Sequence, residues 1–145
     1  MTMFPLVRQN ASDQIRILYV EDHADTLELV TIVLKAHGYE VTTANSIESA
    51  WQLLREEKYD FYLLDSWLSD GSGLELCKRI REVDSETPVL FYSAAAYEVD
   101  RDSAIAAGAQ GYLVKPASLS ELCDLVARLI RPNELHLSRG KGSLH

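Results

Sequence analysis

Four large apolar residues end abruptly at an acid in the stretch Phe61-Tyr62-Leu63-Leu64-Asp65. The run is too short for a helix, and a continuous apolar run is typical of a parallel strand buried on both faces. Polar residues follow other short apolar runs in the same way: Glu21-Asp22 after Ile15 to Val20, Ser93 after Val89 to Tyr92, and Lys115 after Gly111 to Val114. The carboxyl ends of parallel strands share one edge of a sheet, so these five polar side chains are expected to converge in one pocket.

Short apolar runs alternate with segments of helical period five times along the chain, which predicts an α/β domain. Strands are predicted at 15–20, 39–43, 60–64, 88–92 and 110–114, and helices at 25–36, 47–56, 73–82, 97–107 and 119–130. The second strand alternates in polarity, as suits an edge, whereas the first and third are apolar on both faces. With right-handed crossovers, this pattern favours a flavodoxin-like, doubly wound, five-stranded parallel sheet of order 2-1-3-4-5, numbered along the chain.

Local signals mark where several helices begin and end. Ser72 with Glu75, and Ser118 with Glu121, have the spacing of a capping box. Gly38 and Gly108 suit the left-handed residue that ends a helix. Pro132 is expected to stop the last helix. We therefore divide the chain into an N-terminal extension at 1–13, one domain at 14–131 and a C-terminal tail or linker stub at 132–145.

Length and composition set the class of protein. The chain has 145 residues and a formal net charge of −8, which fits one domain and opposes direct binding to nucleic acid or an anionic membrane surface. No apolar stretch approaches the roughly 20 residues that span a bilayer, and no signal peptide is evident, so a cytoplasmic location is expected. Cys77 and Cys123 fall on or beside apolar stripes, which favours buried, reduced thiols.

The acidic residues of the expected pocket suggest a metal site. Carboxylates brought close together repel by about 4 kcal/mol per pair at an effective dielectric of about 20, so such a cluster holds either a proton or a cation. An all-oxygen site favours Mg²⁺, with Mn²⁺ or Ca²⁺ as possible substitutes. We expect Asp22 and Asp65 to be direct ligands, Glu21 to act through water, and a backbone carbonyl near Trp67 to complete the shell.

Lys115 and Ser93 extend this prediction to phosphoryl chemistry. An ammonium group and a hydroxyl can contact the oxygens of a transferred phosphoryl group while a metal ion neutralises the remaining charge. A carboxylate can serve as the nucleophile and form an aspartyl phosphate. Asp65, at the end of a central strand, is best placed for that role.

The chain resembles the receiver domains of bacterial two-component response regulators over about residues 14 to 131. The matching features are the acidic pair Glu21-Asp22, Leu63-Leu64-Asp65 followed by Leu68, Asp70 and Gly73, then Ser93-Ala94 and Lys115-Pro116. One departure is Ser69, where the family usually has proline.

The resemblance implies a role for each matching residue. Asp65 would accept a phosphoryl group from a phosphohistidine of a sensor kinase or phosphotransfer protein, with Glu21 and Asp22 at the magnesium ion and Lys115 on the phosphoryl group. Ser93 and Tyr112 would be the switch residues, and Lys115-Pro116 a cis peptide. The protein would be a signalling switch rather than an enzyme, catalysing only its own phosphorylation and slow dephosphorylation, the latter because Trp67 and Ala95 are apolar. The face formed by residues 97–107, 110–114 and 119–130 would bind a partner or a second copy.

Two other functions remain open at this point. A phosphohydrolase with an aspartyl nucleophile usually has a second aspartate two residues after the first, where this chain has Trp67. A flavin- or nucleotide-binding module is possible on the same fold. However, the loop that begins Glu21-Asp22-His23 lacks the glycines of a phosphate cradle.

Overall fold

The computed structural model of the protein describes residues 14–139, so the predicted extension at 1–13 and the last residues of the tail lie outside it. Its main sheet has five parallel strands in the order β2-β1-β3-β6-β7. These strands are β1 (Arg16–Val20), β2 (Glu40–Ala44), β3 (Phe61–Leu64), β6 (Val89–Ser93) and β7 (Gly111–Val114). Apart from two short strands numbered between them, this is the predicted order 2-1-3-4-5, and each strand lies within one residue of its predicted bounds.

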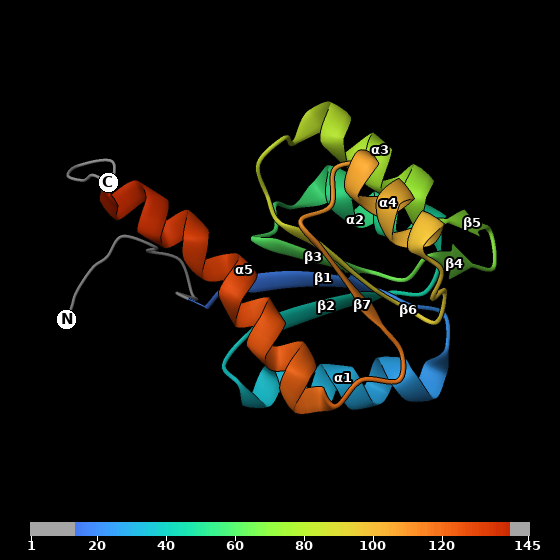
Figure 1. The fold of residues 1–145 in the computed structure, drawn as a ribbon, viewed down its shortest axis with the longest axis horizontal. Coiled ribbons are helices and arrows are strands. Elements are labelled where there is room, and N and C mark those ends of the chain that lie inside the picture. Colours follow the sequence, from blue (N-terminus) through green and yellow to red (C-terminus); the bar gives the residue numbers. More distant parts are fainter. Residues whose placement is uncertain (1–13, 140–145) are drawn as a thin grey trace.

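Five helices cover the sheet on both faces (Figure 1). They are α1 (Ala24–Ala36), α2 (Ile47–Glu56), α3 (Gly73–Val83), α4 (Glu98–Ala106) and α5 (Leu119–Arg139). Helices α1 and α5 pack on one face, and α2, α3 and α4 on the other. The result is the flavodoxin-like architecture expected from the sequence.

The apolar runs of the sequence fill two buried clusters, one on each side of the sheet. Strand β3 is buried along its whole length and contributes to both, since Leu64 faces one cluster and Leu63 the other. Helix α5 packs against the sheet through apolar residues, with Leu122, Cys123 and Val126 among those that are buried. Both cysteines are buried free thiols, as predicted. Helices α2 and α4 bury one residue each, Ala50 and Ala104, but partly buried apolar residues of α2 such as Trp51 also pack against the core, so α4 has the weakest apolar anchorage of the five helices.

The predicted helix signals are present as hydrogen bonds and backbone angles. Ser72 Oγ accepts from Glu75 N at 3.1 Å at the start of α3, and Ser118 Oγ accepts from Glu121 N at 3.0 Å at the start of α5. Gly38 and Gly108 have φ angles of 95° and 113°, in the region that glycine adopts without strain. The ends of these segments are thus set by local chemistry.

Two features differ from the sequence prediction. A small antiparallel ribbon, β4 (Trp67–Leu68) with β5 (Gly71–Ser72), lies between β3 and α3, where we expected only a loop. Pro132 does not stop the last helix, which runs on to Arg139, so that prediction was wrong. Proline inside a helix costs about 3 kcal/mol, but it is followed here by good helix formers such as Glu134 and Leu135, and the backbone remains helical.

None of the helices within residues 14–139 combines the length and the apolarity needed to cross a bilayer.

Candidate functional site

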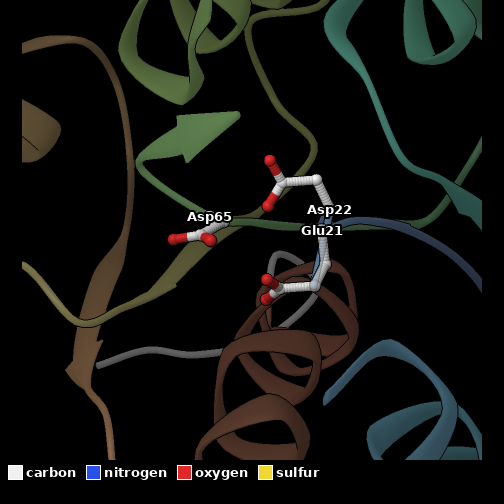
Figure 2. Close-up of side chains that lie close together, drawn as sticks. All are labelled: Glu21, Asp22 and Asp65. Carbon is white, nitrogen blue, oxygen red and sulfur yellow. The ribbon is translucent and has the colours of Figure 1, made fainter. Parts of the chain in front are cut away.

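Three carboxyl groups meet at the carboxyl edge of the sheet, as the sequence predicts. Glu21 and Asp22 follow β1 and Asp65 follows β3, and these strands are neighbours in register. One carboxylate oxygen of each residue lies within 4.8 Å of the others (Figure 2). Glu21 is fully buried, Asp65 half-buried and Asp22 exposed, so the cluster runs from the interior to the surface. This arrangement could hold a divalent cation.

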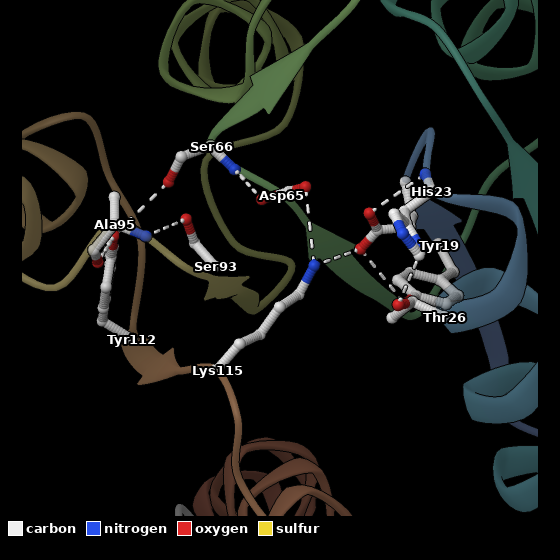
Figure 3. Close-up of polar contacts among 10 residues, drawn as sticks. Tyr19, His23, Thr26, Asp65, Ser66, Ser93, Ala95, Tyr112 and Lys115 are labelled. Atoms are coloured by element: carbon white, nitrogen blue, oxygen red, sulfur yellow. Dashed lines mark hydrogen bonds and ion pairs between the residues drawn. The ribbon is translucent and has the colours of Figure 1, made fainter.

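Lys115 brings a single amine to this cluster from the end of β7. Its Nζ lies 2.8 Å from Glu21 Oε1 and 3.6 Å from Asp65 Oδ2 (Figure 3). The same Nζ lies 5.3 Å from the centre of the Tyr92 ring, a distance at which the ring face attracts a cation. The Lys115-Pro116 peptide is cis, as the resemblance implied. The amine therefore faces the acids.

Burial raises the pKa of the Glu21 carboxyl group above its ordinary value. The hydrogen bond from Lys115 opposes this shift, whereas the charge of Asp65 adds to it. Beneath the cluster, burial and then the charge of Glu21 raise the pKa of Tyr19, so its phenol stays neutral and can donate to Glu21 Oε1 at 3.4 Å. Glu21 is thus held by Tyr19 and Lys115, and its other oxygen accepts from His23 N at 3.3 Å.

The loop that carries Asp65 is anchored on both sides. Ser66 N donates to Asp65 Oδ1 at 2.7 Å, and Ser66 O accepts from Gly73 N at 2.8 Å. A Cβ added at Gly73 would lie only 1.9 Å from Asp65 O, so only glycine allows the start of α3 to approach so closely. Asp70 accepts from the backbone amides of Ile47 and Glu48 at 2.8 and 3.1 Å, bonds that lower its pKa, and ties the loop to the start of α2.

Ser93 and Tyr112 lie on the neighbouring strands β6 and β7, and both are buried. The backbone of Ala95 links them, because Ala95 N donates to Ser93 Oγ at 3.1 Å and Ala95 O accepts from the Tyr112 hydroxyl at 2.7 Å. The Tyr112 ring stacks on Phe91 with 5.9 Å between ring centres. Tyr112 thus occupies an inward position, and the two expected switch residues share one anchor.

Sequence reasoning missed the part that Ser66 and the Ala95 backbone play in this network. Ser66 is 8% exposed, and its hydroxyl lies 3.4 Å from that of Tyr112. Residues 66 and 68 are buried while 67 and 69 are exposed, but the polarity of the sequence Ser66-Trp67-Leu68-Ser69 does not alternate, so no signal in the sequence pointed to Ser66. Trp67, whose carbonyl was assigned to the metal, presents a side chain that is 67% exposed.

Comparisons with known proteins identify the family of the chain. The family model for the response regulator receiver domain matches residues 17–127. Transcriptional regulatory protein TrcR of Mycobacterium tuberculosis is 34% identical over 135 residues, covering 93% of this chain and 52% of that protein. The phosphate regulon transcriptional regulatory protein PhoB of Escherichia coli is 35% identical, covering 80% of this chain and 52% of its own length. This chain therefore spans about half the length of these relatives.

Solved structures extend the similarity to three dimensions. A two-component response regulator from Clostridium difficile matches with a TM-score of 0.78 at 30% identity, covering 81% of this chain and 97% of that one. The non-phosphorylated HemR receiver domain from Leptospira biflexa matches with a TM-score of 0.77 at 32% identity, covering 81% and 94%. Receiver domains accept a phosphoryl group as their standard function. From its sequence, its sheet and its acidic edge, the chain belongs to the family of response regulator receiver domains.

Proposed function

We propose that Asp65 is the residue that accepts the phosphoryl group, and that Glu21, Asp22, Ser93 and Lys115 assist it. The observation that carries this proposal is the position of the Lys115 amine, within 2.8 Å of Glu21 and 3.6 Å of Asp65 at the meeting point of β1, β3 and β7. An ammonium group beside a reactive carboxylate can neutralise the phosphoryl oxygens as they arrive. Asp65 also lies nearer the surface than Glu21, as a phosphoacceptor must.

The proposed reaction is a transfer from a phosphohistidine of a sensor kinase or histidine phosphotransfer protein. A carboxylate oxygen of Asp65 forms a bond to phosphorus while the bond from phosphorus to the imidazole nitrogen breaks. The electron pair of the broken bond stays on the imidazole, which then takes a proton from solvent. The amine of Lys115 faces the transferred group and compensates its charge.

The acidic cluster fits Mg²⁺, since it offers only oxygen ligands and carries three carboxylates against one ammonium group. We assign Asp22, Asp65 and the Trp67 carbonyl to the ion. Both Glu21 oxygens already have a donor, Lys115 Nζ and His23 N, which supports an indirect role for Glu21 through water. When bound, the ion supplies charge neutralisation to the phosphoryl oxygens.

Phosphorylation would be read out through Ser93 and Tyr112. The new charge at Asp65 attracts the Ser93 hydroxyl, and Tyr112, tied to the same Ala95 backbone, responds. Arg101 of α4 lies 5.9 Å from the centre of the Tyr112 ring, which connects the ring to the outer helix. We therefore propose the face formed by α4, β7 and α5 as the surface that changes.

A second copy of the chain is the partner that we propose for this face. Three large apolar side chains at α4 are exposed: Tyr97, Val99 and Ile105. A face with this much exposed apolar surface gains free energy when a second apolar surface covers it.

We also propose a cytoplasmic location. It accords with the two free thiols, because disulfides are rare in that compartment.

The alternative functions gain no support from the site. Trp67 stands where a phosphohydrolase of this chemistry would have its second aspartate. The loop after β1 has an acidic pair where a flavin or nucleotide site would need glycines and free amides. We therefore propose a switch that catalyses only its own phosphorylation and slow dephosphorylation.

The test is phosphorylation of the chain by acetyl phosphate with Mg²⁺, followed by intact mass. We expect one phosphoryl group on the wild type, none on Asp65→Asn, and one on the control Asp60→Asn, which changes an acid at the opposite end of β3. Sedimentation of the same samples should show a dimer only where the group is attached. Equal labelling of Asp65→Asn would reject the assignment of Asp65, and a monomer at full labelling would reject the dimer.

A further inference from the structure

Ser66 occupies the point where the phosphoacceptor loop touches the switch residues. It directly follows Asp65, and its side chain turns away from the acidic cluster toward Tyr112 and Ala95 (Figure 3). With 8% exposure, its hydroxyl has little access to water and depends on protein partners. The Tyr112 oxygen, at 3.4 Å, is the partner that the structure gives it.

The direction of these hydrogen bonds can be worked out from the available protons. A tyrosine hydroxyl has one proton, and Tyr112 donates it to Ala95 O at 2.7 Å, the shorter of its two contacts. Ser66 must therefore be the donor to the Tyr112 oxygen. The chain of bonds runs in one sense, from Ser66 to Tyr112 to Ala95, and Ala95 N in turn donates to Ser93.

The backbone of Ser66 is fixed to Asp65 by the carboxylate itself. Ser66 N donates to Asp65 Oδ1 at 2.7 Å, and a charged acceptor makes this a strong bond. Conversion of the Asp65 carboxylate to an acyl phosphate leaves a neutral carbonyl in place of the charged acceptor, so this bond from Ser66 N weakens. Ser66 follows Asp65 directly in the chain, so weakening of its backbone hydrogen bond can shift its side chain. The hydroxyl of that side chain contacts the hydroxyl of Tyr112.

We propose that Ser66 is a positioning residue that couples the state of Asp65 to Tyr112 by holding the tyrosine in its buried position in the unmodified protein. This role rests on the proposed function, since it presumes Asp65 as the phosphoacceptor. It adds a direct contact from the phosphoacceptor loop to the tyrosine, separate from the path through Ser93. Removal of the hydroxyl shifts the balance between the two positions of Tyr112 by about three- to tenfold, the range for one net hydrogen bond.

The first experiment compares Tyr112 in unmodified proteins. The full chain is labelled with 3-fluorotyrosine, and the Tyr112 ¹⁹F resonance is assigned by its loss in Tyr112→Phe. In Ser66→Ala the resonance is expected to move from its wild-type position toward that of wild type treated with acetyl phosphate and Mg²⁺. The control Ser69→Ala makes the same change at an exposed position of the same loop and leaves the resonance in place. An identical resonance in Ser66→Ala and wild type overturns the proposal.

The second experiment asks whether Ser66 acts through Tyr112. Rates of phosphorylation by acetyl phosphate are measured for wild type, Ser66→Ala, Tyr112→Phe and the double variant. Ser66→Ala is expected to change the rate at least twofold in the wild-type background and to have no effect in Tyr112→Phe, which lacks the hydroxyl. The same factor in both backgrounds would mean that Ser66 acts on Asp65 directly, and the proposal fails.

The two proposals fail in different ways. Absence of labelling in the wild type, or labelling of Asp65→Asn, removes the proposed function. The comparison of Tyr112 in unmodified proteins needs no phosphoryl group, so a null result there removes the Ser66 proposal while the phosphoacceptor assignment stands.

Discussion

At the carboxyl edge of the sheet three carboxylates lie beside the ammonium group of Lys115, whereas at the amino edge Asp84 and Arg81 are enclosed by hydrogen bonds. Asp84 accepts from Glu86 N and Thr87 N at 3.0 Å and from Thr87 Oγ1 at 2.6 Å. Arg81 donates to Asp84 O, to Gly108 O and to Gln110 Oε1, each at 3.0 Å or less. Both edges bound the same strands, yet Asp84 and Arg81 are satisfied by hydrogen bonds whereas the acidic cluster keeps a surplus of negative charge.

This difference shows that one edge of the sheet contributes to stability and the other to chemical reactivity. Charges paired with fixed backbone groups stabilise the segments that lead into β6 and β7, because their partners do not move. A cluster with surplus negative charge costs stability and becomes favourable only when a cation or a phosphoryl group arrives. The carboxyl edge, with its acidic cluster, is therefore the functional edge, and the amino edge, with its hydrogen-bonded charges, is the structural edge.

The largest effect is expected where the functional edge is packed most tightly. Gly73→Ala places a Cβ 1.9 Å from Asp65 O, and the backbone must shift to make room. We expect a loss of about 3 kcal/mol in the free energy of unfolding, measured by urea titration. Gly111→Ala is the matched change at the amino edge, where the added Cβ meets only flexible leucine side chains at 3.1 and 3.2 Å, and it should cost much less. Equal losses would show that the backbone contact at Gly73 is not special.

Removal of the Lys115 ammonium group from the acidic cluster should sharpen the contrast between the edges. Lys115→Met leaves Glu21 and Asp65 without their shared partner, and we expect the rate of phosphorylation by acetyl phosphate to fall about 100-fold. Mg²⁺ should bind severalfold more tightly, because the ammonium group no longer repels it; fluorescence of the exposed Trp67 can follow this binding. The control is Lys58→Met, an exposed lysine at the amino edge. An unchanged rate in Lys115→Met would contradict the role of the amine.

The smallest effect concerns the amino edge and depends on pH. Partial burial tends to raise the pKa of Asp84, but the hydrogen bonds from Thr87 and Glu86 outweigh it and hold the pKa below its ordinary value of 3.8. A lowered pKa in the folded state stabilises the protein above pH 3.8, and this contribution is lost as the pH falls through the folded pKa. We expect Asp84→Asn to cost about 1 kcal/mol at pH 7.

The test of Asp84 is the unfolding free energy of both proteins as a function of pH. The difference between wild type and Asp84→Asn should narrow as the pH falls below 3.8, and phosphorylation at pH 7 should be unchanged. Asp102→Asn, at an exposed position of α4, serves as the control. A difference that stays constant into acid would mean that the Asp84 charge contributes nothing.

Much of the fold and of the acidic edge could be predicted, because their signals are local in sequence. Apolar runs such as Phe61 to Leu64 locate the buried strands, and strand ends fix which polar residues meet. Capping residues such as Ser72 mark the helix starts. The parallel topology then predicts the site, since it places the carboxyl ends of all strands on one edge of the sheet.

The features that the sequence did not predict depend on contacts between distant residues or on balances of free energy. The contact of Ser66 with Tyr112 joins residues 46 positions apart. The ribbon of β4 and β5 has only two residues in each strand, too few for a pattern. The continuation of α5 past Pro132 reflects a local cost set against the helix propensity of the residues that follow.

The length of helix α5 magnifies small changes of angle at its start. Figure 1 shows it reaching well past the sheet, and its 21 residues give it a length of about 30 Å. A tilt of about 10° at its base, beside β7 and Lys115, would carry its far tip through about 5 Å at this length. A small change of angle near the acidic edge thus moves the backbone at Arg139 by about the 5.4 Å pitch of an α-helix.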